Sequence, residues 1–277
     1  MDYRELEVPE DLRRQVQCVW RLSDPNPAPE SQVIYPDGRC ELIVHLAAPM
    51  AWWDPEVGWV PQFTVLFAAQ QRAPIRLTAR GPVDCLGVRL QPAASVLIGG
   101  VQLAALRERI VPLDGLDRGF ARALASAVES FCKGGDDSSL WRLLGTRLAT
   151  PDLDPRIEAA VAALDAAQGQ VRIQRVAELA GLPLRSLQIR FLASVGLSAK
   201  EYARVLRLQA AVRLIDTDRV PLADIAADVG FSDQAHATRE LHLLTGLTPA
   251  RLSKALRGQR NGEQTLQTAA AFVRGRS

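Results

Sequence analysis

Side chains that can donate and accept hydrogen bonds gather near the start of one short stretch, GFSDQAHATRELHLLTGLTPARL at residues 230–252. Gly230 and the small polar residues after it are typical of a tight turn, and apolar residues at helical spacing follow. Gln234, His236 and Arg239 would then lie in the first turns of a short helix, with their side chains exposed. Such a helix could place these side chains against base edges in a DNA major groove, and its free backbone N–H groups could meet phosphates.

An internal repeat of about fifty residues places a similar stretch upstream. VAELAGL at 176–182 aligns with IAADVGF at 225–231 at an offset of 49. VGLSAKEY at 195–202 aligns with TGLTPARL at 245–252 at an offset of 50. Each copy reads as a short helix, a glycine that can adopt a positive φ, and a second helix, which together make a helix-turn-helix.

A long helix is expected to join the two copies. We place the first helix of each copy at 173–180 and 221–228, and the joining amphipathic helix at 198–215. If the second helices enter successive segments of a major groove, the joining helix would hold them about one turn of DNA apart, roughly 34 Å. Its expected buried positions are Tyr202, Leu206, Leu208, Ala211 and Leu214.

Nine polar side chains are candidates for contact with DNA. The candidates for base contact are Arg185, Ser186, Gln188, Gln234, His236, Thr238 and Arg239. Arg204 and Arg207, on the joining helix, are candidates for phosphate contact. Other interpretations stay open, because a polar helix face can simply be solvated, Arg239 could pair with an adjacent acidic residue, and either joining-helix arginine could pair with Glu201.

Residues 155–257 resemble the DNA-binding domain of AraC/XylS-type transcription regulators. The resemblance is carried by YARVLRLQAAVRLI in the joining helix and by IAADVGFSDQAHATREL with TGLTPARL after it. It implies two helix-turn-helix motifs that read adjacent major-groove segments of double-stranded DNA. YPDGRCELIVHL and GVRLQP, nearer the N-terminus, resemble a β-rich sensor domain found in some of these regulators. The chain departs from the family pattern at Pro183, where Ser or Thr is usual, at Ile189, where a basic residue often contacts DNA, and at Ala237, Leu241 and Leu252, where aromatic residues are usual.

The N-terminal third reads as β structure. Short apolar runs recur between Gly and Pro residues, as in a small barrel or sandwich: SQVIY, RCELIVHL, FTVLFAA, PIRLTARG and VDCLGVRLQP. Pro36-Asp37-Gly38 predicts a turn between the first two runs. From Ala93 the pattern becomes helical, with short helices at ASVLIGG and LAALRERI and a helical hairpin at LDRGFARALASAVESFCK and SLWRLLGTRLA.

These patterns predict an α+β multidomain fold. Residues 1–150 form a β-rich, barrel-like or sandwich-like sensor or dimerisation domain with a helical segment at 93–149. Residues 151–260 form an all-α domain with two helix-turn-helix motifs, and residues 261–277 a weakly ordered tail.

Two features of the N-terminal half point to partners. An apolar stripe at helical spacing predicts a homodimer through its helix: Leu116, Phe120, Leu124, Val128 and Phe131. Trp52, Trp53 and Trp59 are candidates to line a site for a small-molecule effector, although a capping hydrophobic patch is the simpler interpretation. RNA polymerase is the further partner that a transcription regulator implies.

Composition and motifs exclude several other classes. With 48% hydrophobic residues the chain can bury a core. Its net charge is +2, and basic residues outnumber acidic ones in residues 151–260. The four cysteines are far apart and predict buried free thiols without a metal site. We find no nucleotide-binding loop, catalytic serine motif or histidine pair, and so expect neither catalytic residues nor a cofactor.

The sequence favours a cytoplasmic, sequence-specific transcription regulator, because it lacks an apolar leader and any apolar stretch long enough to span a membrane. The alternative is a ligand-binding or scaffold protein whose degenerate helical domain no longer reads DNA. A DNA-modifying enzyme that uses the same module is the remaining possibility, and the absence of a reactive-cysteine cluster argues against it.

Overall fold

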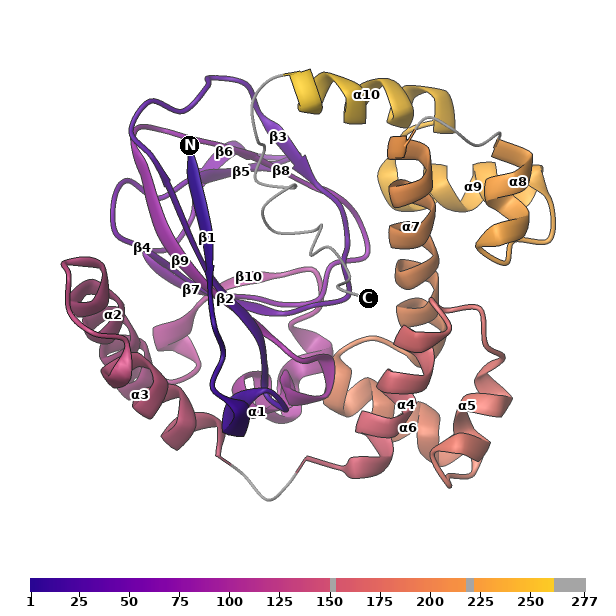
Figure 1. The fold of residues 1–277 in the computed structure, drawn as a ribbon, viewed down its shortest axis with the longest axis horizontal. Coiled ribbons are helices and arrows are strands. Elements are labelled where there is room, and N and C mark those ends of the chain that lie inside the picture. Colours follow the sequence, from indigo (N-terminus) through magenta and orange to yellow (C-terminus); the bar gives the residue numbers. More distant parts are fainter. Residues whose placement is uncertain (150–152, 218–221, 262–277) are drawn as a thin grey trace.

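The chain divides into a β-rich N-terminal half and an all-helical C-terminal half. The computed structural model describes residues 1–149, 153–217 and 222–261, and shows the two halves side by side (Figure 1). Two antiparallel sheets on one side and helices alone on the other confirm the predicted α+β class. Within the described ranges, no helix has the length and apolar character that a membrane crossing requires. Of the tail predicted at 261–277, Asn261 ends the last helix and residues 262–277 lie outside the described residues.

Among the described residues, ten strands form two antiparallel sheets. The larger sheet has six strands in the order β1-β2-β9-β4-β7-β10: β1 Asp2–Leu6, β2 Val16–Asp24, β9 Val83–Leu90, β4 Glu41–His45, β7 Val65–Ala68 and β10 Ile110–Pro112. The smaller sheet has four strands in the order β3-β8-β5-β6: β3 Gln32–Ile34, β8 Ile75–Thr78, β5 Ala51–Asp54 and β6 Gly58–Pro61.

The larger sheet is covered on both faces. Along β2, Trp20 and Leu22 pack with Leu77 of the smaller sheet, whereas Val19 belongs to the cluster that also holds the helices. This alternation follows from the two-residue period of a strand. Gly87 is paired with Trp20, and a Cβ there would lie 2.2 Å from the indole, so no larger residue fits at this position.

Sequence patterns predict five of the ten strands found in the described part of the chain. They miss β1 and β2, whose apolar runs are interrupted by charged residues, and β5, β6 and β10, which have only three or four residues each. The Pro36-Asp37-Gly38 turn is present, with φ +77° at Gly38, but the strands on either side of it do not pair with each other. β3 lies in the smaller sheet and β4 in the larger one, so the turn carries the chain between sheets.

The helical segment of the N-terminal half packs on the larger sheet. It contains η2 Pro92–Ala94, α1 Val96–Gly99, η3 Gly100–Ala105, α2 Arg118–Cys132 and α3 Ser138–Leu148, besides η1 Glu10–Leu12 and η4 Leu113–Gly115. LAALRERI is therefore not one helix, since it begins in η3 and its final isoleucine opens β10.

The apolar stripe of α2 faces the core of its own chain. Phe120, Leu124 and Val128 are 5%, 0% and 0% exposed, and Leu116 and Phe131 are half-buried against the same cluster. The prediction that this stripe forms a dimer interface is wrong, because the larger sheet and α3 already cover it. A homodimer through another surface stays a prediction.

Over residues 153–217 and 222–261, the C-terminal half consists of seven helices: α4 Pro155–Ala166, α5 Ile173–Leu179, α6 Leu184–Val195, α7 Ala199–Thr217, α8 Leu222–Asp228, α9 Gln234–Thr245 and α10 Pro249–Asn261. In Figure 1, α7 runs between a lower group, α4 to α6, and an upper group, α8 to α10. Its 19 residues correspond to a length of about 28 Å.

α7 is buried on more than one face. Tyr202, Leu208 and Ala211 are buried as predicted, but so are Val205 and Val212, which lie on other faces. Both groups of helices and the N-terminal half pack against it, so a helix expected to bury one face is buried on several.

The buried stripe leads to a test of α2. Leu124→Ala should lower the free energy of unfolding by about 2–5 kcal/mol, because it leaves a cavity in a closed core. Urea unfolding measures this loss, and sedimentation at several protein concentrations should show the wild-type oligomeric state. A variant with wild-type stability and altered assembly would instead place α2 at an interface between copies.

Candidate nucleic-acid interface

Helices α6 and α9 repeat one design at an offset of fifty residues. Both have 12 residues, and each ends at a glycine in the left-handed region, Gly196 with φ +85° and Gly246 with φ +71°. Leu187 and Phe191 are fully buried in α6, and Ala237 and Leu241 take the corresponding places in α9. The residues between these anchors therefore have the same orientation relative to their own motif.

The turns before the two helices also match the predicted repeat. Gly181 and Gly230 have φ values of +62° and +76°, which glycine adopts without strain. α6 begins three residues after its glycine and α9 begins four residues after, so the second turn is one residue longer. Both copies are helix-turn-helix motifs, α5 with α6 and α8 with α9.

The first turns of α6 expose polar side chains. Arg185 and Gln188 are exposed and have no side-chain partner in the described part of the chain, and Ser186 is half-buried. Arg190 is instead held by Asp154 at 2.9 Å. Pro183, at the N-cap, provides no side-chain acceptor, so N–H groups of the first turn remain available to an anion.

The first turns of α9 are more constrained. The Asp233 carboxylate accepts the His236 backbone N–H at 2.7 Å, and this hydrogen bond holds the pKa of Asp233 below its usual value. The His236 ring lies edge-on to Phe231, 5.4 Å between centroids, with Nδ1 3.1 Å from the Ser232 hydroxyl. Thr238 donates a hydrogen bond to the backbone carbonyl of Gln234. The side chain of Gln234 is exposed and takes no part in this hydrogen bond.

Arg239 is the freest cation of α9. It is exposed and makes no ion pair with the described residues, because the adjacent Glu240 is occupied by Arg204 from α7. Arg204 donates from Nε to Glu240 at 2.7 Å and from Nη2 at 3.3 Å, a two-point contact between helices. The predicted alternative partner of the joining-helix arginines, Glu201, is not used by either of them.

Arg207 also has a partner within the chain. It donates to the Gly169 carbonyl at 2.6 Å and lies 6.0 Å from the centre of the Phe231 ring. Burial lowers the pKa of Arg207. Since both joining-helix arginines are engaged, their contact with phosphate stays a prediction.

The core of the second motif includes residues of the N-terminal half. Ala237, Leu241 and Leu252 are each fully buried although small for their positions in the family pattern. Tyr35 belongs to the same cluster with only 2% exposure, and burial raises its pKa to about 12. The ring that follows β3 thus supplies bulk that the motif itself lacks.

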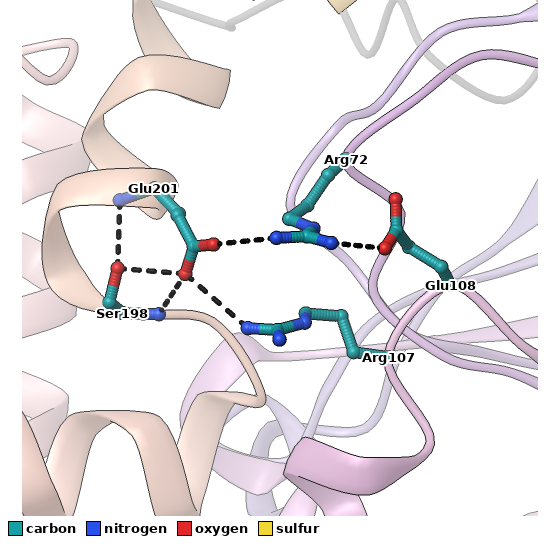
Figure 2. A network of polar contacts seen from close by, with 5 residues as sticks. All are labelled: Arg72, Arg107, Glu108, Ser198 and Glu201. Carbon is teal, nitrogen blue, oxygen red and sulfur yellow. Dashed lines mark hydrogen bonds and ion pairs between the residues drawn. The ribbon is translucent and has the colours of Figure 1, made fainter.

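An ion-pair network joins the N-terminal half to the start of α7 (Figure 2). Glu201 accepts from Arg72 at 3.2 Å and lies 3.6 Å from Arg107, while Arg72 also binds Glu108. Glu201 receives the Ser198 backbone N–H at 2.9 Å, and the Ser198 hydroxyl accepts the Glu201 N–H, so the two residues form a capping box. One carboxylate therefore caps α7 and binds two arginines of the other half.

The titration of Glu201 reflects these contacts. Burial acts to raise its pKa, but the Ser198 N–H and hydroxyl together with Arg72 and Arg107 outweigh burial and hold the pKa below its ordinary value. The carboxylate is therefore charged at neutral pH, and its contribution to docking is lost only in acid.

Sequence reasoning did not locate this interface. Arg72 and Glu201 lie 129 positions apart, and no periodicity links them. The sequence YPDGR, which resembles a stretch of the sensor domain in some regulators, is the part of the sequence that could have indicated an interdomain contact. Its Pro36 carbonyl accepts a hydrogen bond from Gln209, and its Arg39 binds Asp165.

The three tryptophans predicted to line an effector site do not face one common site. Trp53 and Trp59 pair across β5 and β6 with 5.4 Å between ring centroids, and Arg76 lies over both rings at 5.7 Å. Trp52 points to the other face of the smaller sheet, where it packs with the core between the sheets. A single effector site lined by all three is therefore not formed.

A separate hollow of about 330 Å³ lies between the end of β4 and α2. His45 lies at its wall, hydrogen-bonded to Gln62 at 3.0 Å, and burial lowers the pKa of His45. The histidine is a buried residue whose ring has a hydrogen-bond partner. All four cysteines are free thiols, with Cys132 the least buried.

Two family models match the chain. Residues 176–255 match a helix-turn-helix domain, which covers both motifs from α5 to α10. Residues 4–112 match a domain of unknown function, DUF6597, which covers both sheets.

The chain is also similar to known regulators. It is 34% identical over 112 residues to the HTH-type transcriptional regulator RipA of Corynebacterium glutamicum, a match that covers 39% of this chain and spans about a third (34%) of that relative's length. Among solved structures, ToxT from Vibrio cholerae covers 92% of this chain and 99% of its own, with 11% identity and a TM-score of 0.44. The DNA-binding domain of AdpA, solved in complex with a target DNA, covers 39% of this chain and 97% of its own, with 24% identity and a TM-score of 0.36.

The helix-turn-helix family model, over residues 176–255, falls on the two motifs that the geometry repeats. Residues 176–255 are therefore a helix-turn-helix domain of the AraC type, the kind of domain found in DNA-binding transcription regulators.

Proposed function

We propose that this chain recognises a specific DNA sequence with two non-identical readers, α6 and α9, placed in successive segments of the major groove. The observation that carries the proposal is the shared register of the two helices, which presents side chains from equivalent positions on one rigid support, α7. In such motifs the second helix contacts base edges with its N-terminal residues.

Individual roles follow from exposure. Arg185 and Gln188 are free to contact bases from α6, and Gln234 and Arg239 from α9. Ser186, His236 and Thr238 are partly buried or bonded locally, so they contribute at the edge of each contact area. Arg204 braces α9 through Glu240 and thereby orients the second reader.

The N-terminal half, residues 1–150, acts in this proposal as a sensor or dimerisation domain for the DNA-binding domain, residues 151–260. It contacts α7 through Glu201 and Gln209 and supplies Tyr35 to the second motif. A small-molecule effector, a second copy of the chain or RNA polymerase could act through these contacts. A cytoplasmic location is part of the same proposal.

Selection of bound duplexes from a random pool tests DNA reading by the intact protein. We expect one enriched sequence and an affinity that falls steeply with salt, since phosphate neutralisation releases counterions. If no sequence is enriched and the protein binds all duplexes equally weakly, a ligand-binding or scaffold protein with a degenerate helical domain is favoured.

Substitutions in the two readers should affect separate blocks of the selected site. Arg185→Ala and Gln188→Ala should relax specificity in one block, and Gln234→Ala and Arg239→Ala in the other. Each lost base contact should cost about 1–3 kcal/mol. The base preference of each variant at every position of the site decides the outcome. The two-reader proposal fails if all four variants lose preference at the same base pairs.

The interdomain carboxylate can be tested separately from its capping role. Glu201→Gln keeps a side-chain oxygen for Ser198 but removes the charge that binds Arg72 and Arg107. At neutral pH the variant should lose about 1 kcal/mol of unfolding free energy or less for each ion pair. Because the folded pKa is depressed, this contribution is complete above the ordinary glutamate pKa of 4.5 and disappears as pH falls through the lower folded value.

Ser198→Ala is the matched control for this experiment. It weakens the cap of α7 and removes the hydroxyl hydrogen bond to Glu201, but leaves both arginine contacts in place. The part of the acid dependence that comes from the two arginines should therefore remain in Ser198→Ala and be lost in Glu201→Gln. Urea midpoints measured across pH give both comparisons. If Glu201→Gln shows the wild-type acid dependence, the carboxylate does not hold the two halves together.

A further inference from the structure

The first reader carries a large apolar side chain on its exposed face. Ile189 is 62% exposed in the middle of α6, one position after the exposed Gln188 and four after the exposed Arg185. A β-branched residue gains nothing from helix propensity, and at this exposure it contributes little to the core. The side chain is therefore available to a partner.

The repeat defines where Ile189 points. Fifty positions later, at the same place in a helix of the same length and anchors, α9 carries Arg239. Arg239 is exposed and lies on the face proposed to read bases. Equivalent positions on the two readers therefore present a cation in one motif and a branched hydrocarbon in the other.

The chemistry of the groove limits what an isoleucine can recognise there. Base edges in the major groove offer hydrogen-bond donors and acceptors, and the one apolar group among them is the C5-methyl of thymine. An isoleucine cannot pair with the polar groups and leaves them without partners. Its neighbours on the helix, Arg185 and Gln188, supply the polar contacts around it.

We propose that Ile189 determines specificity by packing against a thymine methyl group in the DNA block read by α6. This inference rests on the proposed function. Burial of one methyl group corresponds to about a fourfold gain in affinity. The effect is absent for any base without the methyl group, including deoxyuridine, which pairs like thymine.

The test uses the full chain and the duplex selected from the random pool. Each thymine of the site is replaced in turn by deoxyuridine, which removes the methyl group and keeps every hydrogen bond. At one or two positions in the α6 block, wild-type affinity should fall about fourfold. With Ile189→Ala, binding to the thymine duplex should fall by a similar factor, and the difference between thymine and deoxyuridine should vanish.

Two variants serve as controls. Gln188→Ala should weaken binding and retain the thymine–deoxyuridine difference. Leu243→Ala removes another exposed apolar side chain, 65% exposed near the end of α9, and should also leave the difference unchanged. Circular dichroism of Ile189→Ala should match the wild type, because the side chain is outside the core.

The outcomes separate the inference from the proposed function. If the protein binds a specific duplex and no deoxyuridine substitution shows an effect that depends on Ile189, the methyl contact is wrong and the two-reader proposal stands. If no duplex is bound specifically, the proposed function fails and the inference fails with it.

Discussion

The hydroxyl of Tyr202 is the point on which the arrangement of the two halves depends. The side chain is fully buried, donates to Asp165 of α4 at 2.6 Å and accepts from Arg39 of the N-terminal half. Burial raises the pKa of Tyr202, so the hydroxyl keeps its proton. A buried hydroxyl and a buried guanidinium are both costly without partners, and this arrangement satisfies both only when the turn after β3, α4 and α7 meet. A Cβ at Gly38 would lie 2.8 Å from the Tyr202 ring, which explains why glycine stands at this point of contact.

The same ring also anchors the first reader. Phe191 of α6 lies 5.7 Å from Tyr202, between ring centroids, so docking of the N-terminal half and positioning of α6 share one packed contact. The second reader depends on the N-terminal half in another way, through Tyr35. Since α7 is buried by all of these neighbours, the two sheets and both readers are joined through packed side chains rather than through a flexible linker.

The features that the sequence predicts correctly are those that depend on residues close together in the chain. The repeat was predictable because glycine, helix length and apolar spacing are local signals, and the expected glycines and anchors occupy the expected places. Strand β2 was not predicted although it is central, because Arg21 interrupts its apolar pattern, and only the structure shows that Asp84 of the neighbouring strand pairs with it. The stripe on α2 was read correctly as apolar, but periodicity cannot distinguish a chain's own core from a second copy. Contacts such as Arg39 with Asp165, 126 positions apart, leave no local trace at all.

The two readers share a backbone and differ in electrostatics. The start of α6 has a proline cap and no adjacent carboxylate, whereas the start of α9 has Asp233, whose depressed pKa keeps it charged. A phosphate near the first turn meets unpaired N–H groups at α6 and a negative charge at α9. The cationic Arg239 thus lies on α9, whose first turn carries the charged Asp233. The apolar Ile189 lies on α6, whose first turn carries no carboxylate. Under the two-reader proposal, these differences and the fixed placement of both helices on α7 mean that a single chain would engage its site in one direction only.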